Sequence, residues 1–138
     1  MKLTTYSDGG SRGNPGAAAY AFLLCDQEGK VIKKGARYLG RMTNNEAEYL
    51  GLLAAIEAAR QHGADELDIF MDSELVVNHV LGRYAVKAAN LRPHYEKAME
   101  ALAALRSYRI KHVPRENPMI KQADALVNQE LDICTARH

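Results

Sequence analysis

The sequence is poor in several residues that mark particular classes of protein. Its 138 residues include no tryptophan, two cysteines and four prolines. The cysteines, Cys25 and Cys134, are too few for a disulfide-stabilised mini-protein and lack the spacing of a metal site. We therefore expect two reduced thiols, and a disulfide stays open only if the two residues lie close in space.

The sequence also lacks a large excess of charge of one sign and long hydrophobic runs. Lysine and arginine number 18 and aspartate and glutamate 17, so the net charge is +1. This balance argues against a protein that holds nucleic acid by bulk charge alone, although local basic patches remain compatible with it. The apolar runs are too short to span a membrane, and the N-terminal residues become polar too early for a signal peptide. We expect a cytoplasmic protein without membrane contact.

The overall composition is that of an ordinary globular domain. Hydrophobic residues make up 47% and charged residues 25% of the chain, and a chain of this length can bury a core. It contains no internal repeat, low-complexity tract or linker. We expect a single domain over residues 1–138, and nothing in the sequence demands more than a monomer.

The first half of the chain changes from a strand pattern to a helix pattern. Alternation predicts strands over residues 2–7, 17–26 and 31–39, and a Gly-rich loop over 9–16 joins the first two. A 3.6-residue period follows over residues 44–62 and predicts a helix. Thr43 and Asn44 offer N-cap side chains for this helix, and Gly63 supplies its end.

The second half alternates single strands with helices. The expected elements are a strand over 66–71, helices over 73–81 and 91–105, a strand over 108–113 and a helix over 120–133. Single strands between helices favour parallel additions to the first three, which are antiparallel. The sequence therefore predicts an α/β fold, a five-stranded mixed sheet with helices on both faces.

Four carboxylates occupy suggestive positions. Asp8 and Asp72 each end an apolar strand, and ligands collect at strand ends in open α/β sheets. Glu48 lies at the edge of the apolar arc of the first helix, and Asp124 lies in the first turns of the last one. Each alone is more commonly a cap, a turn residue or a surface acid. Helical spacing does not separate Glu48 from Glu46.

Together these acids suggest a metal site. Carboxylates in one crevice repel each other, and Mg²⁺, which prefers oxygen ligands, relieves that repulsion. Two such ions about 4 Å apart can activate a water and stabilise the leaving oxygen in phosphodiester hydrolysis. Neither a Gly-Lys-Ser/Thr phosphate loop nor a Gly-x-Ser-x-Gly elbow competes, and the five histidines show no paired zinc spacing.

Linked motifs along the chain resemble ribonuclease H type 1, particularly its compact bacterial and archaeal forms. In chain order they are YSDGGSRGNPG at 6–16, TNNEAEY at 43–49, DSELV at 72–76, VPREN at 113–117 and ADALVN at 123–128. The match spans essentially the whole chain in the family's order. The resemblance implies the ribonuclease H-like fold and cleavage of the RNA strand of RNA/DNA hybrids, with 5′-phosphate and 3′-hydroxyl products.

The resemblance also implies roles for individual residues. The family's four acidic residues fall on the four carboxylates above, with Glu48 chosen over Glu46 and also contacting an RNA 2′-hydroxyl. They imply two Mg²⁺ ions in the substrate-bound site, with Mn²⁺ as a substitute. The expected substrate-binding residues are Gly9, Gly10, Asn14, Thr43, Asn44 and Asn45. An asparagine amide suits a 2′-hydroxyl, since both donate and accept, and the glycines let backbone approach the strand. Thr43 matches a position that holds a DNA phosphate.

Some positions depart from the family pattern. Arg115 stands where many members carry a loop histidine, and it would act by charge because arginine does not titrate near neutral pH. His112 is the alternative, but its place within a strand favours a structural role. The basic, Trp-containing protrusion of larger members is missing over residues 82–90. Arg83, Tyr84 and Lys87 remain as candidate contacts for the DNA strand, although core packing is the commoner fate of a tyrosine.

Other functions on the same fold remain alternatives. A non-catalytic module that binds hybrid or double-stranded RNA could dispense with Asp72 or Asp124, and both are present. A resolvase- or integrase-type nuclease has no need of asparagines that read 2′-hydroxyls. We therefore expect a metal-dependent endoribonuclease, and the sequence leaves open whether it also cuts double-stranded RNA.

Overall fold

A twisted five-stranded sheet forms the centre of the computed structural model, which describes residues 1–136; residues 137–138, including the fifth histidine, lie outside the described residues. The strand order is β3-β2-β1-β4-β5. The strands are β1 (Lys2–Gly13), β2 (Gly16–Cys25), β3 (Val31–Met42), β4 (Glu66–Met71) and β5 (Ser107–His112). The first three are antiparallel, and β4 and β5 add in parallel. The predicted mixed sheet is confirmed.

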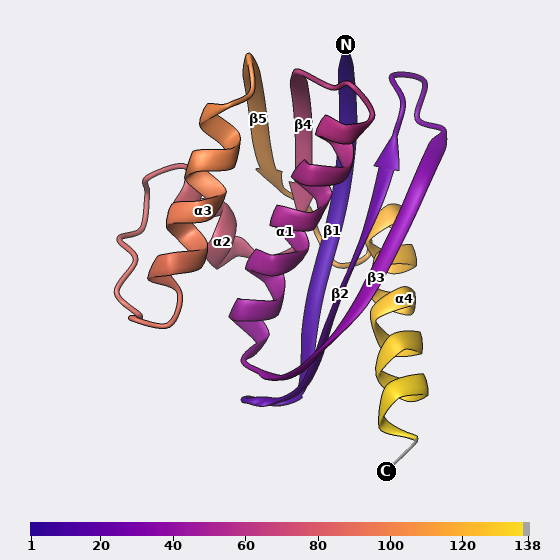
Figure 1. Ribbon diagram of the computed structural model, residues 1–138, viewed down its shortest axis with the longest axis vertical. Helices are drawn as coiled ribbons and strands as arrows, with labels where there is room; N and C mark the ends of the chain where they lie inside the picture. Colours follow the sequence, from indigo (N-terminus) through magenta and orange to yellow (C-terminus); the bar gives the residue numbers. More distant parts are fainter. Residues whose placement is uncertain (137–138) are drawn as a thin grey trace.

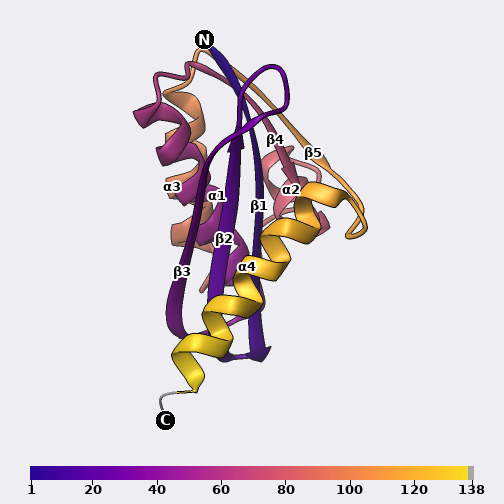
Figure 2. The same cartoon turned by 90° about the vertical axis from the view of Figure 1, so that its right-hand side faces the viewer.

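Four helices cover the two faces of this sheet. They are α1 (Asn44–Gln61), α2 (Glu74–Val80), α3 (Arg92–Ala103) and α4 (Pro118–Thr135). The first three share the larger apolar core on one face, and α4 closes a smaller core on the other. Figure 2 shows α4 crossing the sheet on the side opposite α1 and α3. Within residues 1–136 no helix is long and apolar enough to cross a bilayer.

Most predicted element bounds agree with the structure to within two residues, but the loop expected over 9–16 is wrong. β1 continues to Gly13, and its backbone pairs with β2 as far as Gly16. Glycine and asparagine favour turns, yet continuous pairing with a neighbouring strand overrides such local preference. β3 likewise extends to Met42, beyond the expected end at residue 39. Cys25 and Cys134 are free thiols, as predicted.

The unequal lengths of β1 and β4 create an open strand edge. β4 ends at Met71, which lies opposite Ser7, and from Asp8 onward β1 pairs only with β2. The chain leaves β4 through Asp72 and turns directly into α2. The N-terminal turns of α1 pack against the same stretch of β1, where Gly9 lies beside Ala47. Three elements therefore meet where the two predicted strand-end aspartates lie.

Candidate active site

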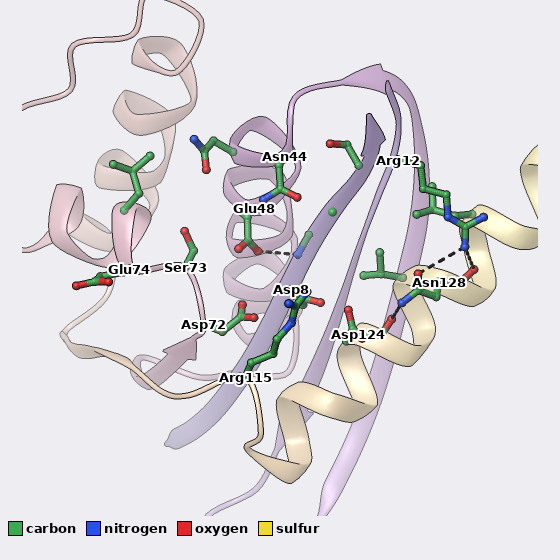
Figure 3. Close-up of a pocket in the computed structure, with 17 residues that line it drawn as sticks. Asp8, Arg12, Asn44, Glu48, Asp72, Ser73, Glu74, Arg115, Asp124 and Asn128 are labelled. Atoms are coloured by element: carbon green, nitrogen blue, oxygen red, sulfur yellow. Dashed lines mark hydrogen bonds between the residues drawn. The ribbon is translucent and has the colours of Figure 1, made fainter. Parts of the chain in front are cut away.

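A cleft of about 480 Å³ opens where β1 outruns β4. All four predicted acids line it, and each comes from a different segment: β1, α1, the turn after β4, and α4. They are Asp8, Glu48, Asp72 and Asp124. Figure 3 shows their side chains gathered around the edge of β1. The fold thus brings together residues that are as far apart in the sequence as Asp8 and Asp124.

Three of the acids form a tight group. Asp8, Glu48 and Asp72 each offer a carboxylate oxygen, and these oxygens lie within 4.8 Å of one another. Asp8 and Glu48 are buried, with 6% and 5% of their surface exposed. Asp124 lies outside this trio but lines the same cleft, and its charge reaches Asp8.

The structure separates the two glutamates that helical spacing left equivalent. Glu48 faces the cleft, where its Oε1 accepts a 2.6 Å hydrogen bond from the Gly9 N–H. Glu46 instead closes a capping box at the start of α1, because its Oε1 accepts from both the backbone N–H and the hydroxyl of Thr43. Glu48 is therefore the α1 acid of the cleft, in agreement with the resemblance.

The negative charge of the cleft is poorly compensated. Burial, together with the charges of Asp72 and Asp124, raises the pKa of Asp8 to about 8. Burial and the charges of Asp8 and Asp72 also raise the pKa of Glu48, opposed only in part by the Gly9 N–H and Arg115. One oxygen of Asp72 is buried and has no hydrogen-bond partner among residues 1–136. An all-oxygen donor set with unmatched negative charge fits a hard divalent cation such as Mg²⁺.

Gly9 is required by the packing of α1 rather than by the approach of a substrate. A methyl group at this position would fall 2.5 Å from the Glu48 backbone nitrogen. The same close approach allows the Gly9 N–H to reach the Glu48 carboxylate. Gly10 lines the cleft and has more room, since a methyl group there would meet Val127 at an ordinary 3.6 Å.

The predicted substrate-binding residues divide into two groups. Asn44 and Asn45, at the start of α1, line the cleft, whereas Asn14 and Thr43 do not. Asn14 accepts a 3.0 Å hydrogen bond from the Asn44 N–H through its Oδ1 and so ties the β1–β2 turn to α1. Thr43 is the N-cap of α1. The turn and cap chemistry that these residue types favour is therefore present at both positions.

Arg115 reaches the cleft from the loop between β5 and α4. It is exposed, and Figure 3 shows its side chain pointing toward the acids. Its charge opposes the rise in the pKa of Glu48, which places it within electrostatic reach of that carboxylate. His112 is exposed on β5 and is not part of the cleft wall. Arg115 and Asp124 both line the cleft.

Several cleft residues were not singled out from the sequence. The polar ones are Ser11, Arg12, Ser73, Glu74 and Asn128. Arg12 is held by Asp132 of α4 through a 2.6 Å contact and by weaker contacts to Asn128. All five lie within the motifs that contain the acids. Their place in these motifs, rather than their residue type, is the feature of the sequence that could have identified them as cleft residues.

A second cleft adjoins the first along the segment between α2 and α3. It shares Asn45 and Leu75 with the acidic cleft and includes Arg83, Tyr84 and Lys87 in its wall. Tyr84 is 46% exposed, so the expectation that it packs in the core is wrong. The backbone N–H groups of Arg83 and Tyr84 both donate to the Asn78 carbonyl, and this tight turn carries the segment along the surface.

Comparisons with known proteins agree with this geometry. A family model described as reverse transcriptase-like matches residues 6–130. Ribonuclease HI of Halobacterium salinarum is 40% identical over 131 residues, which cover 95% of this chain and 65% of that protein. A bifunctional protein of Mycobacterium tuberculosis is 39% identical over 96% of this chain, but only 36% of its own length is covered. The chain thus spans about two thirds or less of these curated relatives.

Solved structures show the same likeness. The RNase H1 of Halobacterium salinarum superposes with a TM-score of 0.92 at 39% identity, covering 96% of this chain and 99% of that one. LC11-RNase H1, solved in complex with an RNA/DNA hybrid, gives a TM-score of 0.90 at 33% identity, with coverages of 96% and 99%. Similarity of sequence over nearly the whole chain, together with the same fold, shows that the chain belongs to the ribonuclease H type 1 family.

Proposed function

We propose that this chain is an endoribonuclease that hydrolyses the RNA strand of RNA/DNA hybrids with two divalent metal ions. The observation that carries the proposal is the group of three carboxylate oxygens, from Asp8, Glu48 and Asp72, within 4.8 Å of one another. The unpaired oxygen of Asp72 adds to it. The hybrid complex of the similar LC11-RNase H1 supports the choice of substrate.

The four acids of the cleft would hold the ions, with Mg²⁺ as the resident metal and Mn²⁺ as a substitute. Metal ions bound there supply Lewis-acid stabilisation of phosphate charge and activation of a water. The buried carboxylates contribute by staying close together, although their raised pKa values show that this costs free energy without a cation. The expected products carry 5′-phosphate and 3′-hydroxyl ends.

The chain's neutral residues are proposed to recognise the RNA strand. Asn44 and Asn45 present amides at the cleft, and an amide can both donate to and accept from a 2′-hydroxyl. Asn14 acts by holding the Asn44 backbone in place. Gly9 and Gly10 belong to the stretch of β1 beyond the end of β4 that lines the cleft, and the RNA strand would run along this stretch.

Two cationic regions complete the proposed substrate contacts. Arg115 would offset phosphate charge beside Glu48, acting by charge and not as a base. The DNA strand would follow the second cleft past Arg83, Tyr84 and Lys87, and Thr43 would contact one of its phosphates in addition to capping α1. Because the basic protrusion of larger family members is missing, we expect this chain to hold the hybrid more weakly and with greater salt sensitivity than those members do. We keep a monomer acting in the cytoplasm as the working expectation.

A cleavage assay tests this proposal directly. Strand-labelled RNA/DNA hybrid, double-stranded RNA and DNA duplex of one sequence are incubated with the protein in Mg²⁺, in Mn²⁺ or in chelator. We expect metal-dependent cutting of the RNA strand of the hybrid and no cutting of the DNA duplex. The double-stranded RNA shows whether the substrate range extends to RNA alone. Hybrid that is bound but uncut in both metals would contradict the proposal and indicate a binding module.

A further inference from the structure

A buried polar contact connects α1 to α2. Tyr49 follows Glu48 in the sequence and is completely buried, and its hydroxyl lies 2.6 Å from Nδ1 of His79 on α2. His79 is only 4% exposed. Within residues 1–136 this is the one side-chain hydrogen bond that joins the two helices. Neither residue touches the acidic cleft.

The roles of the two partners follow from their surroundings. Burial lowers the pKa of His79, so the ring is neutral at physiological pH. The Tyr49 O–H has no other acceptor among the described residues, so it donates to Nδ1 and the ring proton resides on Nε2. The two rings also stack, with centroids 6.0 Å apart and planes 15° from parallel. Tyr95 of α3 meets the His79 ring edge-on. Both side chains are therefore held in one arrangement.

Each partner of this contact follows one of the acids along the chain. Glu48 precedes Tyr49 directly, and Asp72 precedes Ser73, the N-cap of α2, whose Oγ accepts from the Val76 N–H. The α2 helix has seven residues, too few to be stable without tertiary contacts. A shift of α2 against α1 would therefore move Asp72 relative to Glu48.

We propose that the hydrogen bond from Tyr49 to His79 is a positioning contact that fixes the separation of Glu48 and Asp72 and so sets the metal affinity of the cleft. The inference rests on the proposed function, because it assigns the metal site to these acids. Contacts that orient metal ligands typically change metal affinity or activity by about 10–100-fold when they are removed. The loss also leaves a buried polar group unpaired, which lowers stability.

The test separates positioning from stability with four single variants. Tyr49→Phe removes the donor, and His79→Leu removes the acceptor while filling the space. His79→Asn keeps an acceptor near the position of Nδ1. Ile56→Val, at a buried position of α1 away from the acids, is the matched control and should cost about 0.5–1.5 kcal/mol of stability. Metal affinity is read from the rise in unfolding temperature during Mg²⁺ and Mn²⁺ titrations, which needs no substrate.

We expect Tyr49→Phe and His79→Leu each to weaken metal binding about tenfold, within the range for such supporting contacts. They should lower kcat for the hybrid by a similar factor and leave KM unchanged. The double variant should lose no more than either single one, since both remove one contact. His79→Asn should recover most of the metal affinity. Ile56→Val should lower the unfolding temperature and leave the metal affinity unchanged.

Metal affinity and kcat that stay at the wild-type level in Tyr49→Phe and His79→Leu, with only the unfolding temperature lowered, would overturn the inference. Equal effects from Ile56→Val would do the same. Failure of the proposed function gives a different result. If the wild-type chain leaves the hybrid uncut but the two variants bind metal more weakly than the wild type does, the positioning contact stands and the proposed function fails. A wild-type chain that binds neither metal would overturn both.

Discussion

Two regions at the start of α1 each contain a glutamate, and they shift the pKa of its carboxyl group in opposite directions. In the cap region, formed by Thr43 and Glu46, the carboxylate accepts from the Thr43 N–H and hydroxyl, and these bonds lower the pKa of Glu46. In the acidic cleft, burial and the neighbouring aspartates raise the pKa of Glu48 despite its bond to Gly9. A single residue, Ala47, separates the two glutamates.

The difference shows which region serves stability and which serves chemistry. In the cap region, the charge of Glu46 is satisfied by hydrogen bonds from Thr43 within the protein. The cleft keeps three carboxylate oxygens together and leaves one buried oxygen of Asp72 unpaired. Groups with strongly shifted pKa values in a cleft mark functional sites, where proteins accept a loss of stability. Changes in the cleft should therefore lower activity, and changes in the cap should lower stability.

The largest effect is expected for Asp72→Asn. It removes one charge from the trio and leaves the shape of the side chain almost unchanged, so metal binding should fail while the fold persists. We expect hybrid cleavage to fall by at least about 10³-fold, which corresponds to about 4 kcal/mol of lost transition-state stabilisation. The measurement is kcat/KM on a labelled hybrid in Mg²⁺.

The matched control is Glu57→Gln, an exposed acid on the same helix as Glu48 but outside the cleft. It should cleave at the wild-type rate, and both variants should unfold at temperatures close to that of the wild type. Wild-type turnover by Asp72→Asn would show that the carboxylate trio is not the metal site.

The next effect is a gain in stability from Asp8→Asn in chelator. The pKa of Asp8 is raised to about 8 in the folded chain, whereas an unfolded aspartate titrates near about 3.9. The folded state therefore holds a proton that the unfolded chain has lost over this range, and wild-type stability falls as pH rises from about 4 to about 8. Asparagine removes this dependence. We expect the stability gain to be almost absent below about pH 4, to grow as the pH rises and to be largest near pH 8, measured by urea unfolding.

Adding Mg²⁺ reverses the order of the two proteins. The ion offsets the charge of the wild-type cleft and should raise its unfolding free energy, while Asp8→Asn should respond weakly. A stability difference that is the same at pH 5 and pH 8 would mean that Asp8 is not held under charge repulsion in the metal-free protein.

The same comparison explains what the sequence could predict. The order of elements along the chain, the parallel additions and the positions of Asp8 and Asp72 follow from apolar patterns and strand ends, which are local signals. Glu46 and Glu48 flank the same helical arc, and only the close approach of α1 to Gly9 distinguishes them. That approach is a tertiary contact, so the residues alone left the choice open and the family resemblance resolved it.

The two wrong expectations have a related cause. The stretch from Gly9 to Gly16 has the composition of a loop, but pairing with β2 keeps most of it in a strand. Tyr84 is of a residue type that commonly packs in the core, but the turn whose N–H groups donate to the Asn78 carbonyl places it at the surface. In both cases backbone hydrogen bonds with distant or neighbouring residues outweigh the preference of the side chain.

Gly9→Ala should lower both stability and activity, and so differ from changes confined to the cap region or to the cleft. The added methyl group would overlap the backbone of Ala47 and Glu48, so α1 must move away from β1. We expect a loss of about 2 kcal/mol in the free energy of unfolding, in the range for overpacked sites. Cleavage should fall as well, because the Gly9 N–H no longer reaches the Glu48 carboxylate. Chemical denaturation and a cleavage assay measure the two losses.

Gly10→Ala is the control for this variant, since its methyl group would make only an ordinary contact with Val127. Its stability should stay within about 0.5 kcal/mol of the wild type, as at most surface sites. Equal losses from both alanines would mean that strand flexibility, and not the approach of α1, is what glycine supplies here.

The smallest effect sharpens the comparison from the cap side. Glu46→Ala removes the acceptor for the Thr43 N–H and should cost about 1 kcal/mol of stability, typical of a lost helix cap. Because the pKa of Glu46 is lowered in the folded chain, this contribution is present above the ordinary glutamate pKa and is lost as pH falls below it. Glu46→Gln retains the capping box and should recover most of the loss. Both variants should cleave hybrid within about twofold of the wild-type rate, a change below about 0.5 kcal/mol, since Glu46 does not line the cleft. A collapse of cleavage in Glu46→Ala at unchanged stability would place this carboxylate in the reaction and remove the distinction between the two glutamates.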